Sequence, residues 1–162
     1  MITMARRVFF SFHYDDVFRA NQVRNSWVTQ GKEAAGFIDK AEFEKVEKRG
    51  QKAIENWINQ QLNGTSVTVV LIGPETLNRY YVHYEICQSL NKGNSIIGVK
   101  IHNINSISKL CRSGNVNTIV AQINGRDFKF CDIADGIYNY VNDNGYLNMG
   151  KWIESSAMKN NK

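Results

Sequence analysis

The chain has 162 residues, and its hydrophobic content of 43% and charged content of 22% are typical of an ordinary globular protein. A chain of this length predicts a single domain over residues 1–162, with a core at about 6–156 and a frayed C-terminal tail. No apolar run is long enough to cross a bilayer, and the N-terminus lacks the apolar stretch of a signal peptide. We therefore expect a cytoplasmic protein.

The charge and the cysteines exclude several classes of site. The formal net charge is +5, but the basic residues are scattered and form no stripe interleaved with aromatics, which argues against nucleic-acid binding. A mild positive balance suits an anionic nucleotide ligand equally well. Cys87, Cys111 and Cys131 are odd in number and widely spaced, which favours neither a disulfide framework nor a zinc site. The histidines do not form a ligand-spaced set with them, so we expect no metal.

In the N-terminal part, short apolar runs alternate with longer amphipathic runs. The short runs are typical of strands and the longer runs of helices. The charged stretch from Lys40 to Lys48 lacks a clear apolar stripe, so it is interpreted as a loop or a loose helical turn. A helix follows from about Gly50 to Leu62 and ends at Asn63-Gly64, and its buried residues are expected to be Ile54, Trp57, Ile58 and Leu62. The earlier expected elements are a strand over 7–12, a helix with its stripe at Ala20, Val23 and Trp27, and a short strand over 34–38 that ends at Asp39.

The middle of the chain carries the clearest pattern. Val67 to Ile72 is a continuous β-branched and aliphatic run, which predicts a strand buried on both faces. Gly73-Pro74 ends it, a helix begins at about Asn78, and Ser95 to Ile101 is a second buried strand. This β-α-β crossover implies a parallel sheet.

The helix of that crossover holds the strongest candidate for a catalytic group. Val82, Ile86 and Leu90 recur with helical spacing and form its buried stripe. Glu85 lies on an adjacent face, so we expect it at the edge of the core, with the aromatic side chain of Tyr81 one turn earlier. A carboxylate held there suits catalysis. The alternative is a solvated helix glutamate.

The C-terminal part is less regular. Residues 103–117 are polar, with a turn of helix at 107–110, and a type I′ hairpin joins runs 118–123 and 126–131 through Asn124-Gly125. A helix is predicted from Asp132 to Asn144-Gly145, with Ile133, Ile137, Tyr140 and Val141 buried. Trp152 and Ile153 pack a short terminal helix. The whole pattern predicts an α/β doubly wound, mainly parallel sheet of about five strands, with helices on both faces.

Two stretches of the sequence resemble TIR domains. The run from Val69 through Tyr84-Glu85-Ile86 resembles their third strand, following loop and helix. An aromatic residue, three residues and a Glu form the enzymatic signature of the family, here Tyr81-Val-His-Tyr-Glu85, with Tyr where Trp is usual. Arg7-Val-Phe-Phe-Ser-Phe-His-Tyr resembles the first TIR strand, which leads into the nucleotide-contacting loop. The chain is similar to the TIR-like proteins of bacterial Thoeris antiphage systems, which implies a flavodoxin-like sheet.

The resemblance implies cleavage of the nicotinamide–ribose bond of NAD, with NAD as substrate and with no cofactor. Breaking that bond builds positive charge on the ribose, and a fixed carboxylate stabilises it, a role that fits Glu85. The implied substrate-binding residues are Ser11, Phe12, His13, Asp39 and Tyr81. Phe12, Asp39 and Gly73 should cluster at the carboxyl ends of the strands, where open α/β sheets bind ligands. Each of these residues could instead have a purely structural role. Phe12 and Tyr81 would then be core aromatics, Asp39 a turn residue at the end of a strand, and His13 a loop residue.

The resemblance also implies partners. An ADP-ribose-derived signal, cyclic or conjugated, would be made when phage infection is sensed and would activate a separate effector protein. Self-association on activation and a phage-derived trigger are expected. The competing interpretation is a non-enzymatic TIR-like assembly or adaptor module. A phospho-receiver is excluded, because Gly73 stands where its acceptor Asp would end the third strand, and the absence of a Gly-x-x-x-x-Gly-Lys loop argues against an NTPase.

Overall fold

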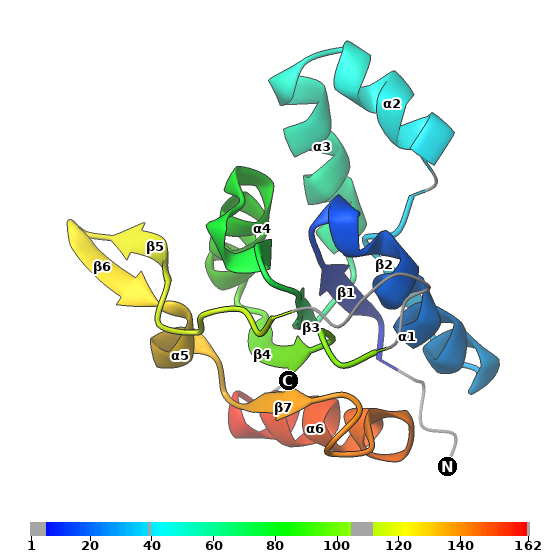
Figure 1. Ribbon diagram of the computed structural model, residues 1–162. Helices are drawn as coiled ribbons and strands as arrows, with labels where there is room; N and C mark the ends of the chain where they lie inside the picture. Colours follow the sequence, from blue (N-terminus) through cyan, green and yellow to red (C-terminus); the bar gives the residue numbers. More distant parts are fainter. Residues whose placement is uncertain (1–5, 39, 105–111, 162) are drawn as a thin grey trace.

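The computed structural model describes residues 6–38, 40–104 and 112–161 (Figure 1). Its strands are β1 (Val8–Ser11), β2 (Ala34–Ala35), β3 (Val67–Ile72), β4 (Ser95–Lys100), β5 (Ile119–Ile123), β6 (Arg126–Lys129) and β7 (Ile137–Asn139). Its α-helices are α1 (Val17–Thr29), α2 (Lys40–Lys48), α3 (Gln51–Leu62), α4 (Tyr80–Lys92), α5 (Phe130–Ile133) and α6 (Gly145–Lys159). Two 3₁₀ turns, η1 (Tyr14–Asp16) and η2 (Thr76–Asn78), precede α1 and α4.

The main sheet of the described chain has five strands in the order β2-β1-β3-β4-β7, and every pair in it is parallel. This is the order of flavodoxin-like folds, in which the chain first winds one way from β1 and then the other. The predicted α/β doubly wound class is therefore confirmed. β1 and β3 lie in the middle of the sheet, and each of their residues is buried, as the unbroken apolar run in β3 predicts.

Helices cover both faces of the sheet, as Figure 1 shows. On one face α1 and α6 pack against β1, β3 and β4, and their buried stripes include Val23, Trp27, Met149 and Ile153. On the other face α4 packs against β3 and β4, and α3 packs against β1 and β2. The predicted stripes of α1 and α4 are confirmed in Ala20, Val23, Trp27, Val82 and Ile86, whereas Leu90 is only half-buried.

The stretch from Lys40 to Lys48 is the regular helix α2, so its interpretation as a loop or loose turn is wrong. Two apolar residues one turn apart explain the helix. Val46 packs against the core cluster of α3, and the Phe43 ring stacks on the Tyr14 ring with centroids 6.0 Å apart and planes at 9°. These two contacts supply the apolar face that the sequence pattern does not reveal.

The predicted helix from Asp132 to Asn144-Gly145 is also wrong, because only α5 is helical and Ile137–Asn139 form the edge strand β7. Gly98, Val99 and Lys100 of β4 pair with β7 in parallel register. Val141, expected to be buried, is half exposed to solvent. The last helix, α6, begins at Gly145 and runs to Lys159, so it is longer than the short terminal helix expected around Trp152 and Ile153. No helix in the described part of the chain has the length and apolar character needed to cross a membrane.

The predicted hairpin is confirmed by the antiparallel pair β5–β6, which projects beyond α4 in Figure 1. Its turn residues Asn124 and Gly125 have φ angles of 54° and 77°, the left-handed values that a type I′ turn requires. Val120 and Phe130 attach the hairpin to the α4 face of the sheet. The expected helical turn at 107–110 lies outside the described residues.

Candidate active site

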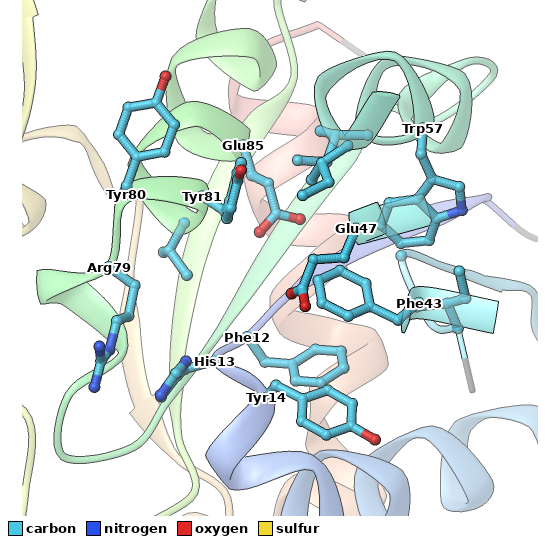
Figure 2. Close-up of a pocket in the computed structure, with 15 residues that line it drawn as sticks. Phe12, His13, Tyr14, Phe43, Glu47, Trp57, Arg79, Tyr80, Tyr81 and Glu85 are labelled. Atoms are coloured by element: carbon cyan, nitrogen blue, oxygen red, sulfur yellow. The ribbon is translucent and has the colours of Figure 1, made fainter. Parts of the chain in front are cut away.

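A cavity of about 400 Å³ opens at the carboxyl ends of β1 and β2, where doubly wound sheets bind ligands (Figure 2). Its walls come from the loop after β1, the loop after β2, and helices α2, α3 and α4. Its size is in the range of pockets that hold small molecules. The residues that line it are Phe12, His13, Tyr14, Gly36, Ile38, Phe43, Glu47, Ile54, Trp57, Ile58, Arg79, Tyr80, Tyr81, Val82 and Glu85.

Glu85 lies in the second turn of α4, and Figure 2 shows its carboxyl group directed into the cavity. The side chains of Val82 and Ile86 on either side of it are in the core, so the helix cannot turn Glu85 out into solvent. Glu85 is 7% exposed. The Ser11 hydroxyl donates a hydrogen bond of 3.1 Å to Glu85 Oε1. The carboxyl group is therefore held from behind, at the end of β1, and open to a ligand in front.

Burial raises the pKa of Glu85 from its ordinary value of 4.5 to about 8, and the hydrogen bond from Ser11 acts in the opposite direction. A buried carboxylate lacks the water that would stabilise its charge, which explains the direction of the change. At neutral pH the empty site therefore holds mainly the neutral acid. Positive charge placed in the cavity would favour the ionised form. A carboxyl group poised in this way is typical of functional sites.

Aromatic rings form much of the cavity wall. The Phe12 ring packs on Phe37 with centroids 4.9 Å apart, and the Tyr14 and Phe43 rings, which both line the cavity, stack on each other. Tyr81, one turn before Glu85, is half-buried and meets Tyr80 edge to face at 5.2 Å. Flat apolar surfaces of this kind suit the ring systems of a nucleotide.

Basic side chains gather at one end of the cavity. Figure 2 shows Arg79 and His13 side by side at the end away from Trp57. Arg79 precedes α4 as its N-terminal cap residue, and His13 precedes η1. His13 Nε2 lies 3.0 Å from Asp15 Oδ2. An anionic group of a ligand would be stabilised by Arg79 at this end. The two carboxyl groups that line the cavity are those of Glu47 and Glu85.

The structure brings most of the predicted site residues together. Phe12, His13, Tyr81 and Glu85 all line the one cavity. Ser11, predicted to contact the ligand, is fully buried behind the cavity wall, and its hydroxyl donates a hydrogen bond to Glu85. Asp39, also predicted as a ligand contact, lies outside the described residues.

Gly73 was expected beside Phe12 at the ends of the strands but does not line the cavity. The carboxylate of Asp16 packs directly over it, and a Cβ at Gly73 would lie 2.1 Å from Asp16 Oδ2. Thr76 Oγ1 accepts a hydrogen bond of 2.8 Å from the Gly73 N–H and donates to Asp16 Oδ2 at 3.4 Å. This glycine therefore allows the end of β3 to approach the start of α1.

The sequence did not reveal Tyr14, Phe43, Glu47, Trp57 and Arg79 as cavity residues. Trp57 was expected in the core stripe of α3, and it is half-buried because one part of it faces the cavity. Arg79 stands two residues before the predicted Tyr81, and this proximity was the available signal. Phe43 and Glu47 reach the site only because α2 is a helix. In the described residues no group of three or more His, Cys, Asp or Glu side chains is arranged to hold a metal ion.

Comparison with known proteins gives the family. A protein of Bacillus cereus (strain MSX-D12) named "Putative cyclic ADP-D-ribose synthase ThsB1" is 54% identical over 102 residues. The match covers 61% of this chain and 53% of that protein, so the chain spans about half the length of its curated relative. A solved structure, the Clostridium botulinum CMP N-glycosidase BcmB, has 16% sequence identity and a TM-score of 0.43, with 89% of this chain and 96% of that chain covered. That likeness is too distant to bear on function. Residues 9–106 match the model of the family described as "Thoeris protein ThsB, TIR-like domain", and the chain belongs to this family.

Proposed function

We propose that this protein cleaves the nicotinamide–ribose bond of NAD and converts the remaining ADP-ribose into a cyclic or conjugated signal. One observation carries the proposal: the carboxyl group of Glu85 is buried, fixed by Ser11 and directed into an aromatic-lined cavity. Membership of the ThsB family and the name of the Bacillus cereus relative support the same chemistry.

The charges around the cavity suit the substrate in one orientation. NAD carries a cationic nicotinamide ring and an anionic pyrophosphate on opposite sides of a ribose. In this orientation the pyrophosphate lies toward Arg79 and His13, at the start of η1. The nicotinamide ribose lies against Glu85. Phe12 and Tyr81 offer flat surfaces to the rings.

The reaction itself breaks the bond between ribose C1′ and the nicotinamide nitrogen. The bonding electron pair leaves with the nitrogen, so nicotinamide departs neutral and the positive charge moves to the ribose ring. The Glu85 carboxylate stabilises that charge, and the approach of a cation favours the ionised form of an acid whose pKa is otherwise about 8. A ring nitrogen of the adenine or another nucleophile then forms the new bond at C1′. No separate cofactor is required for these steps.

The signal is proposed to activate a separate effector protein during phage infection. Continuous loss of NAD would drain the cell, so the free protein is proposed to have low activity until self-association or a phage-derived component switches it on. Helix α2 at the cavity packs against Tyr14 and the α3 cluster. The proposed trigger therefore acts on an ordered wall of the site.

The test is to incubate the purified protein with NAD, with and without lysate from infected cells, and to follow nicotinamide by NMR and the other product by mass spectrometry. We expect nicotinamide release and an ADP-ribose derivative that lacks the nicotinamide mass. Glu33→Gln, a change at an exposed position, is the matched control for Glu85→Gln. Undiminished NAD under every condition would favour the adaptor alternative instead.

The burial of Glu85 argues against that alternative. A protein that served only as an assembly module would gain nothing from a buried carboxyl group in an open cavity, and a neutral amide there would be less costly. The assay on NAD separates the two directly.

A further inference from the structure

We propose that the cavity selects a cationic aromatic ring over a neutral ring of the same shape, and that Glu47 on α2 is the residue that provides this selectivity. The inference deepens the proposed function by identifying how the oxidised, positively charged nicotinamide is recognised. Glu47 is a specificity residue in this account, and Glu85 remains the group that acts on the ribose.

Glu47 is placed for this role by α2. It lies one turn after Phe43 on the same helix, and both residues line the cavity. Figure 2 shows the Glu47 carboxylate directed inward, toward the same space as the Glu85 carboxyl group and above the Phe12 ring. The other acidic residues of α2, Glu42 and Glu44, are exposed like Glu47 but do not line the cavity.

The Glu47 carboxylate acts on the inside of the cavity. Burial raises the pKa of Tyr81, and the negative charges of Glu55 and Glu47 raise it further. Tyr81 belongs to the opposite wall, on α4, so the field of Glu47 extends across the cavity. A negative field that disfavours a phenolate on the far wall favours a cation in the space between.

The walls near Glu47 add a second attraction. Trp57, Phe12, Phe43 and Tyr81 present ring surfaces to the cavity, and aromatic faces attract cations, tryptophan most strongly. Among the residues that line the cavity, Arg79 carries the fixed positive charge, and Figure 2 shows it at the end away from Trp57. The combination of aromatic walls with a carboxylate is how proteins recognise organic cations.

This selectivity has a consequence for the chemistry. Oxidised nicotinamide is a good leaving group because it departs as a neutral molecule, whereas the reduced, uncharged ring would have to leave as an anion. A site that prefers the cation therefore binds the cleavable form of the cofactor and leaves the reduced form in the cell untouched. The protein would then discriminate between oxidised and reduced NAD at binding as well as at the bond-breaking step.

The probes are 1-methylnicotinamide, a cation, and 3-methylbenzamide, its neutral counterpart with carbon in place of the ring nitrogen. Neither contains the glycosidic bond, so binding can be measured by NMR titration whether or not the protein turns over NAD. The variants are Glu47→Gln and, as the matched control on the same helix, Glu44→Gln. Glu47→Lys tests the reversal of charge.

We expect the wild type to bind the cation more tightly than the neutral probe. Because Glu47 is exposed to solvent, Glu47→Gln should weaken binding of the cation by only about threefold and leave binding of the neutral probe unchanged. Glu47→Lys should abolish the preference, and Glu44→Gln should behave as wild type. Equal binding of the two probes by the wild type, no binding of either, or an unchanged preference in Glu47→Gln would overturn the inference. If the preference is found but NAD is never cleaved, the proposed function fails while this inference stands.

Discussion

Replacement of Glu85 by Gln should make the protein more stable, and the gain should grow with pH. The pKa of this carboxyl group is about 8 in the folded protein against an ordinary value of 4.5, because burial disfavours the charged form. Between these two values the folded state binds more protons than the unfolded state, so stability falls as the pH rises. Gln keeps the shape and has no proton to lose.

The size of the effect follows from the two pKa values. At pH 5 the unfolded state gains little by ionising Glu85, and the carboxyl group costs about 1 kcal/mol of folding free energy. At pH 8 Glu85 is fully ionised in the unfolded state but only partly ionised in the folded state. The cost of this carboxyl group in folding free energy then rises to about 4 kcal/mol. The difference between wild type and Glu85→Gln should therefore widen by about 3 kcal/mol over this range. Exposure of only 7% means that solvent screens little of it.

The assay is urea unfolding of wild type, Glu85→Gln and the exposed control Glu33→Gln at pH 5, 6, 7 and 8. Taking differences from wild type removes the contribution of Asp16, whose pKa is also raised by burial. Parallel stability curves for wild type and Glu85→Gln across the pH range would refute the reasoning that this carboxyl group is buried and neutral in the folded protein.

Three further predictions concern the support of the site and the sheet. Ser11→Ala removes the hydrogen bond that lowers the pKa of Glu85, so the acidic limb of the pH–rate profile for nicotinamide release should move to higher pH; an unmoved limb would contradict it. Ile97→Asp places an unpaired charge at a buried position of β4 and should abolish soluble folded protein, as judged by expression and circular dichroism. Gly98→Ala brings a Cβ within 2.6 Å of the Phe130 ring and 2.9 Å of Ile72, and should cost about 1–3 kcal/mol in urea unfolding; no loss would mean that Phe130 packs elsewhere.

Local sequence patterns were sufficient to predict a strand or helix wherever its buried residues follow the spacing of that element. The unbroken apolar run in β3 and the stripe of Val82 and Ile86 in α4 predicted both elements, and they placed Glu85 at the edge of the core. The Asn124-Gly125 turn was equally recognisable, because a type I′ turn restricts its residues strongly. These features depend on contacts close in the chain.

The elements that the sequence did not reveal depend on distant partners. Ile133, Ile137, Tyr140 and Val141 have helical spacing, and only the free edge of β4 makes residues 137–139 a strand. Phe43 and Val46 look like isolated apolar residues until Tyr14 and the α3 cluster provide surfaces for them. The approach of α2 then brings Glu47 to the cavity, which no local pattern could indicate.

The central claim is that Glu85 stabilises the positive charge that develops when the nicotinamide–ribose bond of NAD breaks. The most direct test measures NAD binding and nicotinamide release on the same samples of wild type and Glu85→Gln, with infected-cell lysate present. The account predicts that both proteins bind NAD and that the variant releases nicotinamide at least about a hundredfold more slowly. A folded, NAD-binding Glu85→Gln protein that releases nicotinamide as fast as wild type would contradict it.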